Sequence, residues 1–302
     1  MTRAKQPKPV PQMTIPQFEE AFPHEEACVA YLIARRWPDG VRCSRCGNQH
    51  IYALAPGHHW QCENCAKNGY RFSHLTGTIF ENTNKPLRDW FRVTHMMLTS
   101  KKGISALQIM RVMGFGSYKT AHYMCHRIRS ALVDTDMDKL GGIVEVDETF
   151  VGGKDKNRHW DKKSGGVGGQ ASNKFIVIGA VERKGNAVAR VIERTDTATF
   201  DSFVRSAVSD KVSLLTTDEH SGYRHLRADF PHKYVRHGSG QYVVGAVHTN
   251  TIEGFWSILK RGVVGTYHKV SKKYLPLYVA EFQFRYNNRM NSDIFGTAIA
   301  NA

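Results

Sequence analysis

The clearest pattern of apolar and polar positions lies at residues 248–261, which read HTNTIEGFWSILKR. The apolar residues recur at the helical spacings i, i+3, i+4 and i+7: Ile252, Phe255, Trp256 and Leu259. Glu253 and Lys260 are seven residues apart, so they lie two turns apart along one line at the edge of this apolar stripe. The pattern predicts an amphipathic helix that holds a carboxylate and an ammonium group on one rigid element.

Glu253 has two interpretations. Asn250 lies three residues before it, and this spacing fits a helix N-cap whose Glu side chain returns a hydrogen bond to the cap. Taken alone, the segment favours the cap. Two acidic residues upstream favour a functional role instead, because Asp218 ends an apolar run 35 residues before Glu253 and Asp147 lies in a strand-like run.

The region around these acids, residues 141–302, is predicted to be a mixed α/β domain, because strand-like apolar runs precede the helix that carries Glu253. The predicted strands are 143–151, 175–181, 187–192 and 212–215, with a helix at 200–208. An acidic run followed by Gly141 and Gly142 is typical of a linker and marks the start of this domain. Within it, residues 154–169 are rich in glycine and basic residues and predict a mobile basic loop.

A second helical pattern occupies residues 84–133. Two of its predicted helices, 104–113 and 118–132, flank a glycine-containing turn in which Ser117 is a suitable N-cap. Helix, turn and helix in this order form the DNA-reading helix-turn-helix, and an ordinary helical hairpin has the same pattern. If the second helix reads DNA, its basic side chains would contact phosphates or base edges; the candidates are Lys119, Arg127 and Arg129.

Two Cys-x-x-Cys pairs lie in the region 15–80, with 15 residues between them. The four residues are Cys43, Cys46, Cys62 and Cys65. Thiolates at this spacing can surround one zinc ion tetrahedrally, and four protein ligands leave no open position for chemistry. A redox Cys-x-x-Cys would need a single pair beside a βαβ unit, which this loop-rich segment does not provide. The spacing therefore predicts a structural zinc ribbon.

The chain carries 42 Lys and Arg against 27 Asp and Glu, a formal net charge of +15 over 302 residues. Such a charge favours a polyanionic partner. Nucleic acid fits better than a membrane, because no apolar run approaches the ~20 residues that span a bilayer. The N-terminus lacks the apolar core of a secretory signal, so a cytoplasmic location is expected. Residues 1–14, in which prolines alternate with basic residues, predict a disordered basic arm.

Three acidic residues in this order allow metal-dependent phosphodiester chemistry. Cutting a phosphodiester requires an activated nucleophile and a stabilised leaving oxygen, and two divalent ions held by carboxylates supply both. Mg²⁺ suits this role because it takes oxygen ligands and keeps waters that a substrate can displace. Asp147 and Asp218 at strand ends, with Glu253 on a facing helix, are the predicted ligands.

The chain resembles bacterial insertion-sequence transposases of the DDE superfamily, in the group that joins a zinc ribbon to an RNase H-like catalytic domain. The resemblance covers nearly the whole chain beyond the basic arm. It is carried by the four cysteines and by the segments 144–149 (VEVDET), 217–218 (TD), 248–261, 265–271 (GTYHKVS) and 284–289 (FRYNNR). The fold class that it implies is α/β, with an RNase H-like domain preceded by a zinc ribbon and a small helical region.

The resemblance also implies roles for single residues. Asp147, Asp218 and Glu253 would bind two Mg²⁺ ions, or Mn²⁺ in their place. Lys260 would contact donor DNA near the cut end, with Arg261 beside it. Some members of the group have Asn in place of the last acid, so the presence of Glu253 in this chain indicates an intact site.

These features favour a transposase that binds the terminal inverted repeats of its element, cuts their 3′ ends and joins them to target DNA. A related nuclease without strand transfer has the same motifs. The alternative outside enzymes is a DNA-binding regulator with a zinc ribbon, a helix-turn-helix and an inactive catalytic fold, and the intact acidic triad argues against it. Coupled cutting of two ends implies a homo-oligomer on double-stranded DNA.

Overall fold

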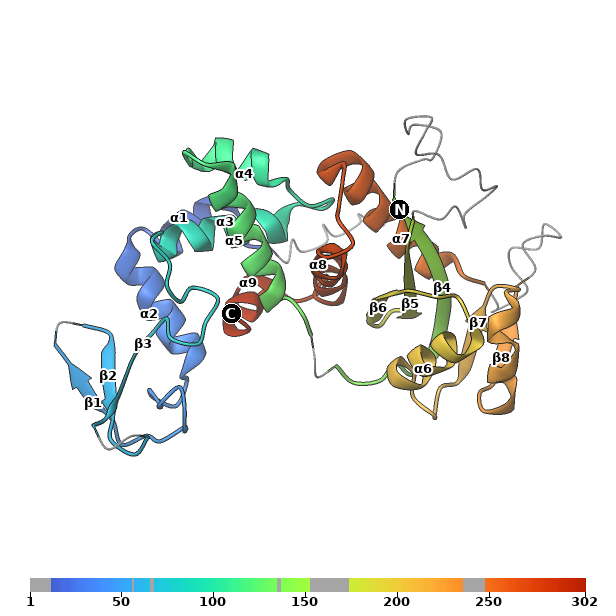
Figure 1. The fold of residues 1–302 in the computed structure, drawn as a ribbon, viewed down its shortest axis with the longest axis horizontal. Coiled ribbons are helices and arrows are strands. Elements are labelled where there is room, and N and C mark those ends of the chain that lie inside the picture. The colour runs from blue at the N-terminus through green and yellow to red at the C-terminus, as the bar shows by residue number, and fades with distance from the viewer. Residues whose placement is uncertain (1–11, 56, 66–67, 135–136, 153–173, 236–247) are drawn as a thin grey trace, which may run out of the picture. The chain divides into compact units, whose positions relative to one another are not determined.

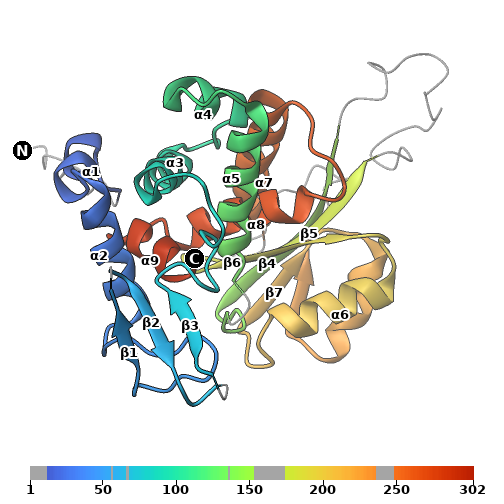
Figure 2. The ribbon, with the colours of Figure 1, turned by 60° about the vertical axis from the view of Figure 1, so that its left-hand side comes forward.

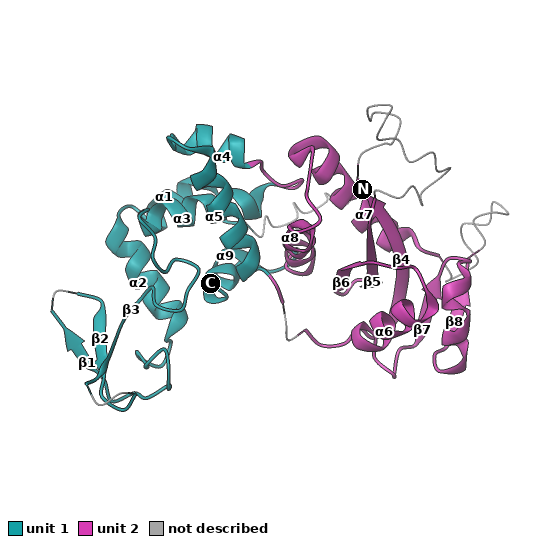
Figure 3. Ribbon diagram, in the orientation of Figure 1, with its two compact units in different colours: residues 1–100, 106–132, 289–302 teal, residues 101–105, 133–288 magenta. Residues whose placement is uncertain are grey.

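The computed structural model, shown in Figure 1, folds into two compact units (Figure 3). Unit 1 comprises residues 1–100, 106–132 and 289–302, and unit 2 comprises residues 101–105 and 133–288. The predicted domain boundaries stay a prediction. The units differ from them in two places: residues 289–302 belong to unit 1, and residues 101–105, within the predicted helical region, belong to unit 2. The described residues are 12–55, 57–65, 68–134, 137–152, 174–235 and 248–302. The basic arm up to residue 11 and the predicted basic loop lie outside them.

Unit 1 begins with two short helices, α1 (Ile15–Ala21) and α2 (Glu25–Arg36). α1 begins after Thr14 because Thr14 and Gln17 form a reciprocal capping box. A small antiparallel sheet follows, with the strands β1 (Tyr52–Leu54), β2 (His59–Cys62) and β3 (Tyr70–Ser73) in that order. Aromatic side chains pack beside the cysteines of this region: Trp37, Trp60 and Phe72.

The rest of unit 1 contains the helices α3 (Leu87–Thr99), α4 (Ala106–Met113), α5 (Tyr118–Ala131) and α9 (Ile294–Ala300). α4 and α5 confirm the two predicted helices, and the Ser117 hydroxyl accepts the Lys119 N–H at the start of α5, as expected of an N-cap. α9 packs against α2 and α3, and the Ile79 N–H donates to the Ala302 carbonyl. Segments far apart in the sequence therefore build unit 1 together.

Unit 2 is built on a mixed sheet whose strands, as far as the chain is described, follow the order β6-β5-β4-β7-β8. The strands are β4 (Ile143–Val151), β5 (Phe175–Glu182), β6 (Ala187–Ile192), β7 (Leu214–Thr217) and β8 (His232–Tyr234). β4, β5 and β6 pair antiparallel, whereas β7 runs parallel to both β4 and β8. β4 and β6 confirm the predicted strands residue for residue. β7 begins two residues later than predicted, because Val212 closes a turn on Ser209 and pairing with β4 starts at Leu214.

Helices cover both faces of this sheet (Figure 2). One face packs on α6 (Thr197–Ala207) and the 3-10 helix η3 (Ser221–Ala228); the other packs on α7 (Asn250–Gly262), the π-helical turn η5 (Val263–Tyr267) and α8 (Leu275–Asn287). β4 alternates between the faces, so Val144 and Val146 lie in the core under α6 while Glu145 and Asp147 face α7. α7 confirms the predicted helix, and all four residues of its predicted apolar stripe are buried.

Candidate catalytic site and zinc centre

The four predicted zinc ligands converge at one point of unit 1. The ligand atoms of Cys43, Cys46, Cys62 and Cys65 all lie within 4.8 Å of one another. The Cys43 and Cys65 sulfurs are 3.5 Å apart, and those of Cys46 and Cys62 are 3.8 Å apart. Zinc–sulfur bonds of about 2.3 Å in a tetrahedron place the sulfurs about 3.8 Å apart, so the cluster has the dimensions of a structural zinc site.

Replacing one cysteine of this cluster should remove the zinc and unfold the region that it holds. Cys62→Ser or Cys46→Ser is expected to abolish the binding of one zinc per chain, since loss of a ligand removes folding energy directly. Metal analysis and thermal melting measure the two effects. Cys28→Ser is the matched control and should keep its zinc, because Cys28 lies outside the cluster. Burial raises the pKa of the Cys28 thiol to about 12, so this thiol stays protonated. A wild-type chain without zinc under reducing conditions would contradict the assignment.

Asp147 and Asp218 are brought together by neighbouring parallel strands of unit 2. Glu145 of β4 is paired with Thr216 of β7. Asp147, two residues after Glu145, and Asp218, directly after the last residue of β7, therefore lie toward the same end of the two strands. The turn after β7 is held by the Asp218 carboxylate, which accepts the His220 N–H at 3.0 Å. The fold therefore brings together two of the three predicted metal ligands, although they are 71 residues apart in the sequence.

The pKa of Asp147 reflects this arrangement. Burial and the negative charges of Glu148 and Asp218 raise the pKa of Asp147 to about 7. Ionising a carboxyl group away from water is unfavourable, and like charges nearby increase the penalty. A divalent cation reverses both effects, because it supplies the opposite charge and binds carboxylate oxygens. Hard oxygen donors with surplus negative charge fit Mg²⁺ or Mn²⁺.

Glu148 is a third carboxylate of this cluster, and the sequence pattern did not single it out. It follows Asp147 on β4, so its side chain points to the opposite face of the sheet. There it accepts a hydrogen bond of 2.7 Å from the Tyr223 hydroxyl of η3. Burial raises the pKa of Glu148, and the charge of Asp218 adds to the shift. The signal that could have found it is the adjacent acidic pair within an apolar strand.

Trp256 of α7 orients the Asp147 side chain. Its indole Nε1–H donates to Asp147 Oδ2 at 3.0 Å. Gly179 lies opposite Asp147 in the register of β5, and a Cβ at this glycine would stand 2.6 Å from the Trp256 ring. Only glycine leaves the indole enough space to reach the carboxylate. One residue of the apolar stripe of α7 thus both packs the core and holds a predicted metal ligand.

Glu253 lies apart from the other two predicted ligands. It is exposed on α7, and its carboxylate accepts a hydrogen bond of 3.1 Å from the Thr249 hydroxyl. Among the described residues, only the cysteine cluster brings three or more potential ligand atoms within 4.8 Å of one another. The carboxylates of Asp147, Asp218 and Glu253 are therefore not gathered to that distance. The alternative interpretation, a reciprocal cap with Asn250, is wrong, because Asn250 is already the first residue of α7. The role of Glu253 as a metal ligand stays a prediction.

The two basic residues at the end of α7 are both exposed. Lys260 lies seven residues after Glu253, as the helical pattern predicted. The Arg261 guanidinium bends back along the helix and donates to the carbonyl and hydroxyl of Ser257 at 3.0 and 2.7 Å. Their contacts to DNA stay predictions.

The three candidate DNA contacts of α5 differ in their surroundings. Lys119 is exposed at the start of the helix. The Arg127 guanidinium donates to the carbonyls of Thr78 and Ile79 and so stabilises a loop of unit 1. Arg129 is only 2% exposed. A buried guanidinium is not available to a phosphate, so Arg129 belongs to the interior of unit 1 and is left out of the DNA surface proposed below.

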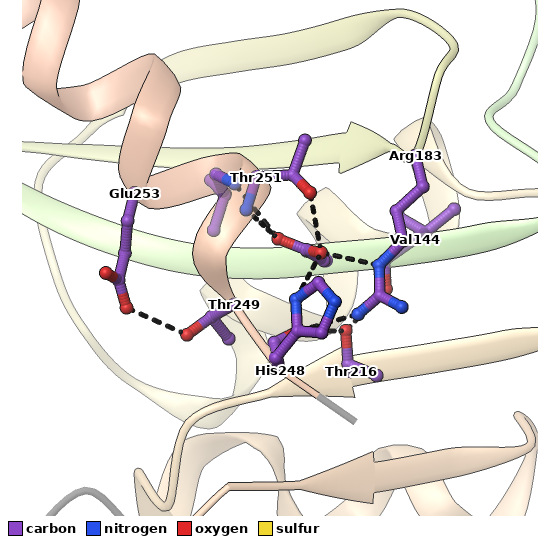
Figure 4. A network of polar contacts seen from close by, with 9 residues as sticks. Val144, Arg183, Thr216, His248, Thr249, Thr251 and Glu253 are labelled. Atoms are coloured by element: carbon purple, nitrogen blue, oxygen red, sulfur yellow. Dashed lines mark hydrogen bonds and ion pairs between the residues drawn. The ribbon is translucent and has the colours of Figure 1, made fainter. Parts of the chain in front are cut away.

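Glu145 is a second residue that the sequence pattern missed, and it lies in a buried polar network (Figure 4). Its carboxylate is fully buried and accepts a hydrogen bond of 2.6 Å from Arg183 Nε. It also accepts the N–H groups of Thr251 and Ile252 at 2.7 and 3.0 Å and the Thr251 hydroxyl at 2.8 Å. These N–H groups belong to the first turn of α7, where a negative charge is favoured and no side chain of the helix itself provides a cap.

Glu145 links the strand that carries Asp147 to the helix that carries Glu253. It lies two residues before Asp147 on the same face of β4, and it holds the N-terminus of the helix that carries Glu253. Arg183 joins the same network by donating to the His248 carbonyl at 3.0 Å. Displacing Glu145 would therefore release the helix from the strand.

Two family matches and one relative place this chain among known proteins. The ISXO2-like transposase domain matches residues 139–287, and the transposase zinc-ribbon domain matches residues 23–68. A protein described as an uncharacterized protein in transposable element ISH50 of Halobacterium salinarum is 30% identical over 281 residues, which cover 88% of this chain and 92% of that protein. A solved chain from the cryo-EM structure of the simian T-cell lymphotropic virus intasome in complex with PP2A regulatory subunit B56 gamma shows 12% identity and a TM-score of 0.31, over 60% of this chain and 64% of that chain.

The chain belongs to the insertion-sequence transposases and carries an ISXO2-like transposase domain at residues 139–287. The predicted family is thereby confirmed. The mixed sheet of unit 2 and the cysteine cluster of unit 1 confirm the predicted fold class, in which a zinc ribbon precedes an α/β transposase domain. Within the described residues, no helix combines the length and the apolar character needed to cross a membrane.

Proposed function

We propose that the chain is a DNA transposase that cuts the ends of its own element and joins them to target DNA, with two divalent cations held by Asp147, Asp218 and Glu253. The observation that carries the proposal is the proximity of Asp147 of β4 and Asp218, which follows the neighbouring parallel strand β7: the charge of Asp218 helps to raise the pKa of Asp147. Family membership supports it, since all three acids fall within the matched segment 139–287. To join the site, the Glu253 side chain breaks its hydrogen bond with the Thr249 hydroxyl and rotates toward the cations. The exposed position of Glu253 allows this rotation.

The residues of the chain prepare this site for a phosphodiester. Bound divalent cations supply a nucleophile and stabilise the leaving oxygen. Trp256 keeps Asp147 in place, the His220 N–H keeps Asp218 in place, and the Glu145 network keeps α7 against β4. Lys260, on the same exposed side of α7 as Glu253, binds a phosphate of the donor strand.

The direct test is cleavage of DNA that carries the terminal inverted repeats of the element. The full chain with Mg²⁺ should nick the 3′ ends and then join them to a target plasmid. Light scattering should show a complex in which more than one chain is bound to two element ends. Nicking without joining would identify a nuclease. Binding without nicking would identify a regulator with an inactive catalytic fold. Neither outcome is compatible with the proposed function.

Affinity for DNA is expected to be largely electrostatic, because the chain carries a net charge of +15. Each neutralised phosphate releases counter-ions and contributes about −0.9 to the slope of log affinity against log salt. Lys119→Ala should reduce the magnitude of this slope by about 1 and leave Mg²⁺-dependent cleavage intact, since Lys119 is exposed in unit 1 while the acids lie in unit 2. Fluorescence anisotropy across a salt series measures the slope, and a flat line would contradict the expectation.

A further inference from the structure

The 3-10 helix η3, which follows Asp218, presents two basic residues on one side. Side chains three residues apart eclipse one another in a 3-10 helix, so η3 has three distinct rows. Tyr223 and Leu226 form the row that is buried in the core. Arg224 and Arg227 form another row, and both are exposed. The local sequence thus sets two guanidinium groups in line, a few residues after a predicted metal ligand.

Among the described residues, these two guanidinium groups differ from the neighbouring cations in that no acidic side chain pairs with them. Arg205 of α6 is paired with two aspartates, and His225 of η3 lies 3.0 Å from Asp201. In the part of the chain that the structure describes, no carboxylate lies within ion-pair distance of Arg224 or Arg227. Two exposed like charges without counter-charges create a positive potential that attracts anions.

A pocket of about 510 Å³ connects Asp218 with both arginines. Asp218 and Glu219 line it together with Arg224 and Arg227 of η3. The Arg227 guanidinium lies over the Tyr234 ring, 4.6 Å from its centroid, and this cation–π contact fixes its direction. The volume is in the range of sites for single small groups, so it can hold one phosphate with its sugar but not a duplex.

We infer that this pocket binds the DNA backbone next to the cut, with Arg224 and Arg227 holding one phosphodiester of the cleaved strand. The inference rests on the proposed function, since a strand whose scissile phosphate lies at Asp147 and Asp218 leaves the site along the adjoining surface. Guanidinium forks match the oxygens of a phosphate and bind them in a bidentate manner. Cations held by Asp147 and Asp218 would neutralise the scissile phosphate, and the two arginines would neutralise a neighbouring one.

The test pairs a change in the protein with a change in the DNA. The full chain and the double variant Arg224→Ala/Arg227→Ala are given end DNA in which single phosphates near the cut are replaced by neutral methylphosphonates. The double variant should cleave unmodified DNA roughly 10-fold to 100-fold more slowly, as expected for the loss of charge-assisted hydrogen bonds. One methylphosphonate should slow the wild type by a similar factor and leave the double variant unaffected, because both changes remove the same contact.

Two controls separate this contact from loss of folding. Arg205→Ala removes a guanidinium that is already paired with aspartates, so it should cleave at the wild-type rate. Arg224→Lys/Arg227→Lys keeps both charges and should retain much of the activity that the alanine variant loses. The inference is overturned if the double alanine variant cleaves like the wild type, or if every methylphosphonate slows both proteins equally.

The outcome also distinguishes this inference from the proposed function. If the wild type binds end DNA but never cuts it, the proposed function fails and the salt dependence of binding tests the pocket by itself. The double alanine variant should then lower the magnitude of the log–log slope by about 1–2. An unchanged slope would exclude the phosphate contact.

Discussion

Asp147→Asn should abolish Mg²⁺-dependent cleavage of end DNA and, in the same protein, make the metal-free chain more stable at pH 8. An amide oxygen is a poor replacement for an anionic ligand on Mg²⁺, so cleavage should fall below detection. The gain in stability follows from the pKa of Asp147, which the fold raises from 3.8 to about 7. Ionisation of this carboxyl group therefore opposes folding.

The pH dependence gives this prediction its sign. The free-energy cost of ionising Asp147 in the folded chain is small below its pKa in the unfolded chain, about 4. This cost grows as the pH rises and is complete above the pKa of Asp147 in the folded chain, about 7. Chemical unfolding in EDTA should show that Asp147→Asn raises the free energy of unfolding by at most ~4 kcal/mol at pH 8, and by less than half of that at pH 5. Asp210→Asn, an exposed aspartate of the same unit, is the control and should change neither stability nor cleavage. Wild-type cleavage by Asp147→Asn would remove Asp147 from the metal site.

Glu253→Gln separates the proposed ligand from a residue that only contacts Thr249. The amide can still accept the Thr249 hydroxyl, so folding and DNA binding should be unchanged. Cleavage should be lost as in Asp147→Asn, because Glu253 is proposed to turn toward the cations. Retained cleavage would limit the site to the carboxylates that the fold already clusters.

Glu145→Ala should destabilise unit 2 strongly, with a loss of roughly 3–5 kcal/mol. It leaves the buried side of Arg183 without its carboxylate and the first N–H groups of α7 without an acceptor. Urea unfolding measures the loss. The control is Glu193→Ala, which removes an exposed ion pair with Lys272 and should leave the midpoint unchanged. Equal midpoints for the two variants would show that the network does not hold α7.

The sequence predicted the structure best where a periodic or regularly spaced pattern depends on neighbouring residues alone. The helical period of α7 and the two Cys-x-x-Cys pairs needed no knowledge of distant residues, and both predictions are confirmed as structure. The ends of helices were predicted less accurately where a polar side chain caps the helix. α6 begins three residues before the predicted helix, because the Asp196 carboxylate accepts the Thr199 N–H and caps the helix.

Features that depend on partners far along the chain could not be predicted. Glu145 is 106 residues from Thr251, so nothing local shows that a carboxylate in β4 caps α7. Glu148 alternates with Asp147 across the sheet and meets η3, a contact that requires the strand order to be known. Arg129 appeared as one of several basic residues on a helix, and its burial depends on which face of α5 packs inward.

The return of α9 to the N-terminal helices has a consequence for how the chain acquires its structure during synthesis. Phe295 of α9 packs against the rings of Phe18, Phe22 and Phe91, which are all buried. Translation delivers the chain from its N-terminus, so these rings lack the Phe295 ring that packs on them until residue 295 has emerged, while nearly all of unit 2 is already available to fold. A chain broken off in α8 would hold every residue of the acidic cluster and lack the ring that completes the aromatic core of unit 1.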